Sequence, residues 1–580
     1  MRDLKSLFKN PPSWYRGAPF WSWNDRLEVD ELIRQVHDME AHGMGGFFMH
    51  SREGLETEYM GPQWLTCIRE TVKAAAEAGT YAWLYDEDRW PSGAAGGLVP
   101  ERGGDAYRAK RLVMVKADTY EPTDYVLAVF RAEVEDDKVR DAVRIAADES
   151  AEAAESETLL VFRREIADAS EWYNDDAPAD NLNPEAVATF IDITYEAYAD
   201  EVGDAFGETI PGIFTDEPNV VGGSVGAEHP WIPWTDGLED YFGERRGYDL
   251  LDHLPSLFLD DEASVKTRHD FWWTVSERYT EAYSKQIGEW CDAHGLAFTG
   301  HYLSENQLGG GIVRGGALMP HYQYQAVPGI DMLMVQTDEN LTVKQCTSVA
   351  HQFGRERVLS ETYGCSGWEM TFEEQKWVGD WQYVLGVNLR CQHLALYTLR
   401  GCRKRDYPPS FNYNTTWWKY NGVVEDYFAR VGLLTTQGEV VRDVLVLHPT
   451  ATGWSMVGDA GDFSGGVQRA NDYGETVNAF TRAVLATHYD FDFGDEQIMA
   501  AHSRVEDGIL WVNEAPYKVV VIPPGTTTVL ASTFELLQQF VESGGYVIAF
   551  EPVPTQLEAE ESVALTSFFA HPDVTVLDDV

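Results

Sequence analysis

The chain has 580 residues, about four times the ~150-residue length of a typical domain, so it can form two or three domains around a large core. Hydrophobic residues make up 44% of it and aromatic residues 13%, which excludes a disordered or collagen-like chain. Its 95 acidic and 44 basic residues give a net charge of −51, which excludes a nucleic-acid partner because phosphate contacts need Lys and Arg.

The first 440 residues repeat one pattern: an amphipathic helix, a glycine, a short apolar strand, and polar residues where the strand ends. In one example Leu32, Val36 and Met39 keep helical spacing, Gly43 can end the helix, and the strand GFFMH follows. Such alternation predicts βαβ units and a parallel sheet. Eight strands are expected, at 19–24, 46–50, 81–87, 212–217, 296–302, 329–334, 357–361 and 393–398. We therefore predict an α/β fold built on a closed (β/α)8 TIM barrel, with an open doubly wound sheet as the alternative.

Two further regions depart from this pattern. Residues 103–180 contain the strand-like runs RLVMVKA, YVLAVFRAEV and TLLVFRREI, which predict a β-rich insertion on the barrel rim. From 441 to 580, the apolar runs DVLVLHP, YKVVVIPP and GGYVIAF alternate with helices, which predicts a small three-layer α/β domain of flavodoxin or amidotransferase type. The glycine-rich run GGGIVRGG (309–316) lacks the strand–turn–helix order of a dinucleotide site, and we expect a mobile loop there.

Carboxylates follow two of the predicted strands at the rim, where barrel enzymes carry their active sites. GIFTDEPNV places Asp216 and Glu217 after the fourth strand, and RVLSETYG places Glu361 at the end of the seventh. Glycosidic cleavage needs such a pair, since one acid protonates the leaving oxygen and the other activates water or attacks the anomeric carbon. A helix N-cap cluster is the alternative for the first pair.

The fifth strand ends in GHYLSENQ, which offers His301 and Glu305. This carboxylate is interpreted as a catalytic helper, a sugar ligand or a ligand of a hard cation, with helix capping as the alternative. Other strand ends carry aromatic and polar side chains that suit the apolar faces and hydroxyl groups of sugars, although core packing is the alternative for each Trp. The predicted substrate-binding residues are Trp23, Asn24, His50, Asp86, Trp90, Asp216, His301, Tyr363, Trp368, Arg403 and Asp406.

The motifs LYDEDRWPSG, FTDEP, HYLSENQ, PGIDML and LSETYG, together with PFWSWN, resemble glycoside hydrolase family 106, the α-L-rhamnosidases, over most of residues 15–450. The resemblance implies that Glu217 is the general acid, Glu305 a supporting carboxylate and Glu361 the general base. It also implies inversion of configuration and, as in some members, Ca²⁺, with no cofactor required. The segment after 440 is similar to the amidotransferase-like trimerisation domain of certain β-galactosidases, which implies self-association into a homo-oligomer, with a domain that only covers the flank of the barrel as the alternative.

The function predicted from these observations is a glycoside hydrolase that removes terminal sugars from oligosaccharides, most like an α-L-rhamnosidase. A β-galactosidase-like retaining enzyme is an alternative, because its acid and nucleophile would occupy the same fourth and seventh strands. A non-catalytic carbohydrate-binding barrel is the other alternative.

The chain also carries information about its surroundings. No run of 18 apolar residues and no apolar stretch after the first basic residues is present, so we expect no membrane contact and a cytoplasmic location. In that location we expect the six scattered cysteines to be reduced thiols. The acidic excess is typical of a halophilic surface, because a Debye length of ~3 Å at 1 M salt screens self-repulsion, with an ordinary acidic protein of a mesophile as the alternative.

Overall fold

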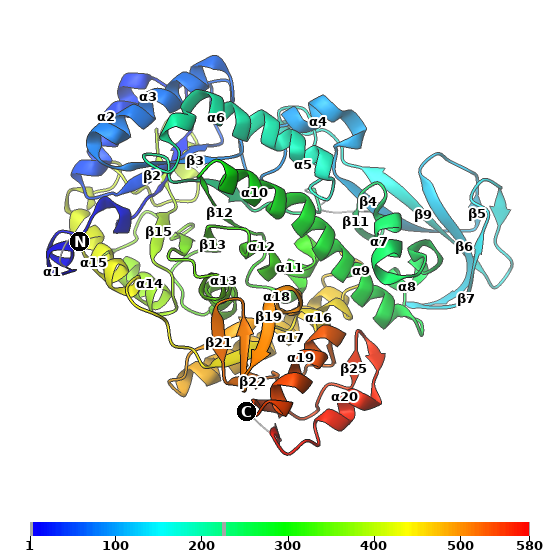
Figure 1. The fold of residues 1–580 in the computed structure, drawn as a ribbon. Helices are drawn as coiled ribbons and strands as arrows, with labels where there is room; N and C mark the ends of the chain where they lie inside the picture. Colours follow the sequence, from blue (N-terminus) through cyan, green and yellow to red (C-terminus); the bar gives the residue numbers. More distant parts are fainter. Residues whose placement is uncertain (1–3, 223–227, 579–580) are drawn as a thin grey trace.

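A computed structural model describes residues 4–222 and 228–578 (Figure 1). Its largest sheet is a parallel barrel with eight strand positions. In barrel order these are β1 (Phe20–Trp23), β2 (Gly46–Ser51), β3 (Tyr81–Tyr85), β10 (Gly212–Asp216), β12 (Ala297–His301), β13 (Val327–Met332), β14 (Leu359–Thr362), and β15 (Leu389–Gln392) continued by β16 (Ala395–Leu396). The predicted (β/α)8 barrel is confirmed.

The eighth strand corrects the expected range of 393–398. It begins at Leu389 and is interrupted at the His393–Leu394 peptide. The earlier half, β15, pairs with β14, whereas the later half, β16, pairs with β1. Each half therefore forms backbone hydrogen bonds with one neighbouring strand, and the two halves together close the barrel.

Side-chain alternation gives the barrel an apolar interior that becomes polar at the rim. Phe20, Phe48, Trp83, Phe214 and Leu359 pack together inside it. Because side chains repeat with a period of two along a strand, the inward positions two residues further on lie at the C-terminal rim. On β2, β10 and β14 these positions hold a histidine, an aspartate and a glutamate.

Helices surround the barrel (Figure 1). They are α2 (Val29–Ala41), α3 (Pro62–Ala78), α5 (Pro184–Phe190), α6 (Glu196–Val202), α9 (Ser264–Tyr279), α10 (Gln286–Ala293), α11 (Leu308–Gly315), α12 (Met319–Tyr322), α13 (Asn340–Gln352), α14 (Phe372–Val384) and α15 (Gly422–Thr435). Gly79 ends α3 in the left-handed conformation at φ 71°, as the repeated glycine predicts. Among the described residues, no helix is long and apolar enough to cross a membrane.

An antiparallel sheet extends from one side of the barrel (Figure 1). Its order is β11-β4-β9-β6-β7. The strands are β4 (Lys110–Ala117), β6 (Val126–Glu135), β7 (Lys138–Ile145), β9 (Thr158–Ile166) and β11 (Trp231–Trp234). The three predicted apolar runs form β4, β6 and β9. The pairing of β11 was not predicted, because this strand comes after β10 and reaches back to β4, where Trp231 lies opposite Val113.

The glycine-rich run at 309–316 is not a mobile loop, and that expectation was wrong. Most of it forms the buried helix α11, which packs on α17 (Gly466–Ala486). A Cβ atom on Gly309 would lie 2.3 Å from the carbonyl oxygen of Val467, so only glycine allows the two helices to approach this closely. Close packing therefore offsets the low helix propensity of glycine, ~1 kcal/mol per residue.

The C-terminal segment forms a second parallel sheet in the order β18-β17-β22-β24-β27. The strands are β17 (Val444–Leu447), β18 (Phe491–Gly494), β22 (Val519–Val521), β24 (Tyr546–Phe550) and β27 (Val574–Leu577), and the helices α16 (Thr450–Trp454), α17, α18 (Glu496–His502), α19 (Ala531–Glu542) and α20 (Val563–Phe568). Numbered along the chain, this is the 2-1-3-4-5 order of flavodoxin-like folds. The predicted small α/β unit is therefore confirmed.

A buried ionic network joins this unit to the barrel. Lys344 of α13 lies 2.8 Å from Asp490, and Arg442 lies 2.6 Å from Asp490 and 2.7 Å from Asp492. The side chains of Lys344 and Asp492 are fully buried. Burial raises the pKa of Asp492, but Arg442 and His351 outweigh it and leave this pKa lowered. Since Asp492 is fully buried, the loss of Arg442 removes compensation for its charge that water cannot replace.

We expect Arg442→Ala to lower the free energy of unfolding by about 3–5 kcal/mol, because Asp492 would lose its main cationic partner while remaining buried. The matched control is Lys518→Ala, which removes the exposed pair between Lys518 and Asp443 at 3.0 Å. Its effect should stay within about 1 kcal/mol. Denaturant unfolding followed by circular dichroism measures both, and equal small effects would contradict a stabilising network.

Candidate active site

A pocket of about 180 Å³ lies at the C-terminal rim of the barrel. It is lined by Arg52, Trp90, Asp216, Glu217, His301, Asp331, Leu333, Glu361, Cys365, His393 and Tyr407. Most of these residues lie in or directly after barrel strands, because the carboxyl ends of parallel strands meet at one rim.

Strand register brings the ionisable groups together in neighbouring pairs. Asp216 of β10 lies beside His301 of β12, and Asp331 of β13 lies beside Glu361 of β14. His301 connects the two pairs: its Nε2 is 3.3 Å from Asp216 Oδ1, and its Nδ1 is 3.5 Å from Glu361 Oε2. His393 Nε2 lies 3.7 Å from the other oxygen of Glu361. One imidazole thus lies between carboxyls that the sequence separates by 145 positions.

These contacts decide where protons lie. Burial raises the pKa of Asp216, but the hydrogen bond and charge of His301 outweigh it and leave this pKa at about 2. Burial lowers the pKa of His301, yet Asp216 and Glu361 hold it well above its usual value. Burial, followed by the charge of Asp331, raises the pKa of Glu361 well above its usual range. At neutral pH, Asp216 and His301 therefore form an ion pair, and protons stay on neighbouring carboxyls.

Glu217 reaches the same pocket although it directly follows Asp216. Consecutive residues of a strand point to opposite faces, but Glu217 has φ 46°, a left-handed conformation that ends the strand. The Asn219 side chain donates a hydrogen bond to its carbonyl oxygen at 3.0 Å. Burial and the charge of Asp216 raise the pKa of Glu217 to about 8, so this carboxyl is protonated at neutral pH.

Arg52 forms the opposite wall. Its guanidinium lies 4.1 Å from the centre of the Trp90 ring and donates two hydrogen bonds to Asp406, at 2.9 and 3.0 Å. Arg52 Nη1 also lies 3.1 Å from Nε2 of His50. Stacking and a bidentate ion pair therefore hold this cation in one place.

Several buried polar atoms of the pocket have no hydrogen-bond partner among the described residues. They are Glu361 Oε2, Asp331 Oδ1, His301 Nδ1 and His393 Nδ1. Buried polar atoms are normally satisfied, so a group of unsatisfied ones around a cavity indicates that a polar ligand completes them.

The structure brings five of the predicted residues into the pocket and leaves the others outside it. Those in the pocket are Trp90, Asp216, Glu217, His301 and Glu361. His50 and Asp406 contact Arg52 from behind. The remaining ones, which do not line it, are Trp23, Asn24, Asp86, Glu305, Tyr363, Trp368 and Arg403.

Trp23 corrects the prediction of a sugar-stacking residue. Phe20 points into the barrel, so Trp23, three residues on, points outward, where it packs against Trp21 and against Trp64 of α3. Asp86 also points outward and accepts hydrogen bonds from Tyr195 and Ser92.

Three other predicted residues are engaged in loop and backbone contacts. Asn24 and Arg403 bond to backbone carbonyl groups, and Tyr363 is fully buried with its hydroxyl on the carbonyl oxygen of Gln375. The side chain of Trp368 is 39% exposed but lies away from the pocket lining.

Glu305 lies behind the pocket. Its Oε1 accepts hydrogen bonds from the Tyr322 hydroxyl at 2.6 Å and the Tyr302 amide at 3.3 Å, and its Oε2 accepts one from the Asp331 amide at 2.9 Å. In this structure, Glu305 holds the backbone of a pocket residue.

Six residues line the pocket but were not among the predicted site residues: Arg52, Asp331, Leu333, Cys365, His393 and Tyr407. Asp331 could have been found from PGIDML, because a lone aspartate in an apolar strand lies on the inward face two positions after Gly329. His393 stands in the same relation to Cys391.

The described residues do not fit a Ca²⁺ site in this pocket. Two trios have atoms close enough to share an ion, Asp216–His301–Glu361 and Glu217–His301–Asp331. Calcium takes six to eight oxygen ligands, whereas each trio supplies two carboxyls and an imidazole nitrogen. The oxygens of Glu305 already accept hydrogen bonds from the protein.

Comparison with known proteins identifies the family. The sequence model of glycoside hydrolase family 106, described as α-L-rhamnosidase, matches residues 175–571. The chain belongs to this family. The matched range includes β10 to β16 of the barrel and most of the C-terminal unit, whereas β1 to β3 of the barrel precede it.

Solved structures of glycosidases share the fold. A rhamnosidase from Novosphingobium sp. PP1Y matches with a TM-score of 0.69 and 14% identity over 100% of this chain and 74% of that one. A β-galactosidase from Rahnella sp. R3 matches with a TM-score of 0.52 and 14% identity over 94% and 72%. A curated protein of Formosa agariphila, described as a proposed β-glucuronidase, is 21% identical over 77% of this chain and 42% of its own length. The chain thus spans less than half the length of this relative.

We expect alkylation of Cys365 to block the pocket. Cys365 and Cys402 are the two exposed cysteines of six, and Cys365 lines the pocket. Burial and the charges of Asp331 and Glu361 raise the pKa of its thiol, so the reaction with iodoacetamide should quicken as the pH rises. An activity assay measures the inactivation, and mass spectrometry identifies the alkylated cysteine. The inactivation should disappear in Cys365→Ser and persist in Cys402→Ser. Full labelling of Cys365 without loss of activity would place the active site elsewhere.

Proposed function

We propose that this family member hydrolyses terminal α-L-rhamnosyl groups from glycosides and oligosaccharides, as an inverting enzyme. The observation that carries the proposal is the occurrence in one pocket of a protonated carboxyl, Glu217, and a second carboxyl, Glu361, beside one imidazolium. Glycosidic cleavage needs an acid and a base in one site, and the imidazolium 3.5 Å from Glu361 supplies a charge that favours ionisation of the base.

The size of the pocket supports removal of a terminal sugar. Its volume of about 180 Å³ is below the roughly 300–1,000 Å³ of sites for drug-sized ligands. One sugar ring suits this space better than an internal segment of a chain. Arg52, Trp90 and Tyr407 supply a polar and aromatic wall for it.

In the proposed reaction Glu217 donates its proton to the glycosidic oxygen. Glu361, once ionised, removes a proton from the water that attacks the anomeric carbon from the opposite side. The ion pair of Asp216 with His301 keeps a positive charge 3.5 Å from Glu361. This cation favours the ionised form of Glu361 against burial and against the charge of Asp331.

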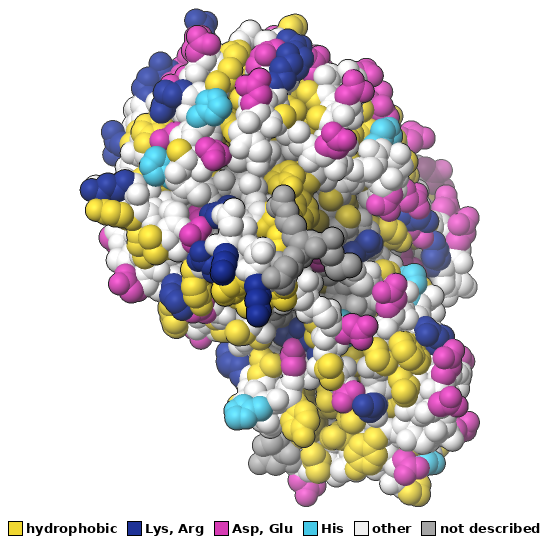
Figure 2. All heavy atoms as spheres, turned by 60° about the vertical axis from the view of Figure 1, so that its left-hand side comes forward, with side chains coloured by type: hydrophobic (Ala, Val, Ile, Leu, Met, Phe, Trp, Pro, Cys, Tyr) yellow, Lys and Arg dark blue, Asp and Glu magenta, His cyan; other side chains and the backbone are white. Residues whose placement is uncertain are grey.

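We also propose a high-salt cellular setting from the net charge of −51. Figure 2 shows Asp and Glu side chains scattered over one face of the molecule rather than gathered in one patch. A cytoplasmic location and self-association through residues 441–580 stay predictions.

We expect Glu217→Gln to lower kcat/KM by about 10²–10⁴-fold for alkyl rhamnosides and far less for aryl rhamnosides with good leaving groups, which need no proton. Glu361→Gln should impair both classes equally, since water activation is needed in each. Because Glu361 must be ionised and its pKa is raised, wild-type activity should first increase with pH, and it should then fall as Glu217, whose pKa is raised to about 8, loses its proton.

Initial rates across pH and ¹H NMR of the first product anomer measure these effects. Equal losses for both substrate classes in Glu217→Gln would assign the acid to another residue. Retention of the anomeric configuration would mean that Glu361 attacks the anomeric carbon itself instead of activating water.

We expect the melting temperature to rise with KCl over the molar range. Lowering the salt concentration to ~10 mM lengthens the Debye length to ~30 Å, so acidic side chains across the surface repel one another. Differential scanning calorimetry at several KCl concentrations measures this. A flat profile between about 0.1 and 3 M would contradict the halophilic interpretation.

A further inference from the structure

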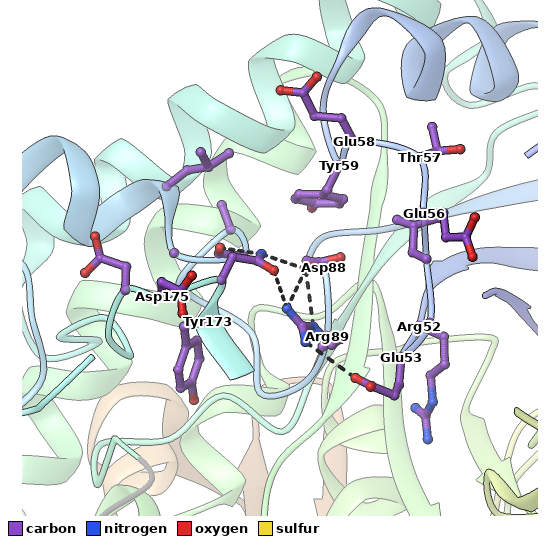
Figure 3. Close-up of a pocket in the computed structure, with 18 of the residues that line it drawn as sticks. Arg52, Glu53, Glu56, Thr57, Glu58, Tyr59, Asp88, Arg89, Tyr173 and Asp175 are labelled. Atoms are coloured by element: carbon purple, nitrogen blue, oxygen red, sulfur yellow. Dashed lines mark hydrogen bonds and ion pairs between the residues drawn. The ribbon is translucent and has the colours of Figure 1, made fainter. Parts of the chain in front are cut away.

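A second cavity, of about 800 Å³, shares Arg52 with the catalytic pocket. Figure 3 shows residues that line it. Three segments form this groove: residues 52–59 after β2, residues 88–101 after β3, and residues 173–176 after the inserted sheet. Arg52 lines both the groove and the pocket. The two cavities are therefore neighbours on the same rim.

Two contacts between the same pair of loops separate the cavities. On the pocket side, Arg52 stacks on Trp90. On the groove side, Glu53 lies 3.4 Å from Arg89, as Figure 3 shows. In each loop, one residue lines the pocket (Arg52 or Trp90) and the residue next to it in sequence lines the groove (Glu53 or Arg89), so these loops form a ridge between the two cavities. A substrate whose terminal sugar occupies the pocket and whose next sugar crosses this ridge enters the groove.

The groove is strongly acidic. Seven carboxylates line it, against the two guanidinium groups of Arg52 and Arg89. The acidic residues are Glu53, Glu56, Glu58, Asp88, Glu101, Asp175 and Asp176.

Both guanidinium groups already have anionic partners. Arg52 bonds to Asp406, while Arg89 contacts Asp88 and Glu53 and donates a hydrogen bond to Asn174 at 2.6 Å. A ligand anion would have to displace these carboxylates to reach either arginine.

Three exposed carboxylates of the groove, Glu58, Glu101 and Asp175, have no cationic partner among the described residues. Such oxygens can accept hydrogen bonds from sugar hydroxyl groups. The same charges repel a carboxylate or sulfate group on the sugar. This repulsion weakens as salt shortens the Debye length.

We propose that this groove receives the leaving-group part of the substrate and selects neutral sugars over uronates and sulfated sugars. The assignment rests on the proposed glycosidase activity of the adjacent pocket. It adds a substrate class, glycosides of neutral saccharides, and names Glu58 and Asp175 as residues that determine it.

Two disaccharides that differ at one carbon atom, a hydroxymethyl group in one and a carboxylate in the other, test the proposal. Both carry the glycone preferred in an aryl-glycoside assay, linked either to glucose or to glucuronate. We expect kcat/KM at ~10 mM salt to be at least about tenfold higher for the glucose compound. At ~1 M NaCl, where the Debye length is ~3 Å, the ratio should fall towards one.

Variants separate electrostatic from steric selection. The double variant Glu58→Gln/Asp175→Asn should lower the ratio of kcat/KM for the glucose compound to that for the glucuronate compound, measured at ~10 mM salt. The matched control is Glu535→Gln/Glu542→Gln, which removes two exposed charges of α19 in the C-terminal unit and should leave the ratio unchanged. A wild-type ratio near one at low salt, or a ratio that neither salt nor the groove variant changes, would overturn the proposal.

A separate experiment distinguishes failure of the proposed activity from failure of the groove proposal. If no aryl glycoside is hydrolysed, the assignment of the pocket fails, and the groove is tested by saturation-transfer NMR with glucose and glucuronate oligosaccharides. Binding of the neutral oligosaccharide alone at low salt, altered in the groove variant, would support selection by the groove. Equal binding of both, or binding of neither, would overturn it.

Discussion

The contacts of His301 with Asp216 and Glu361 are the constraint on which the pocket depends. Burial alone would protonate every carboxyl at this rim, because each charge lost hydration when the barrel closed. One imidazolium stabilises a limited amount of negative charge, and it ionises Asp216 first, leaving protons on Glu217 and Glu361. Both glutamates of the proposed reaction therefore hold protons at neutral pH, and what distinguishes Glu361 is its contact of 3.5 Å with the imidazolium, which favours its ionised form.

The barrel makes this arrangement possible through strand parity. Inward positions are apolar near the bottom of β2, β10 and β14 and ionisable at the rim. Since every second side chain of a strand points inward, the same set of positions forms both the core and the site. Glu217 is the exception, since its left-handed backbone turns a residue of the opposite parity into the pocket. Strain of this kind is commonly found at functional sites.

The C-terminal unit is connected to the pocket by hydrogen bonds as well as by packing. His448, after β17, contacts Gln345 of α13 at 3.0 Å, and the Gln345 amide donates to the Glu305 carbonyl oxygen at 3.0 Å. The Glu305 side chain in turn accepts the Asp331 amide. The family match includes this unit, and its contacts suggest why: α11 and α13, which support the strands of the site, are themselves supported from the C-terminal side.

The sequence by itself determined the barrel, the three main strands of the insertion, the C-terminal α/β unit, and the carboxylates at the ends of the fourth and seventh strands. These follow from local patterns, since apolar periodicity and glycine positions act over a few residues. Tertiary structure alone decided that α11 is a packed helix, that β11 joins the inserted sheet, and that Trp23 faces the helices. It also decided that Asp331, His393 and Arg52 share a pocket with Glu217. Those outcomes depend on strand register and on contacts between distant segments, 41 residues apart for Trp23 and Trp64 and 118 for Trp231 and Val113, which no local pattern encodes.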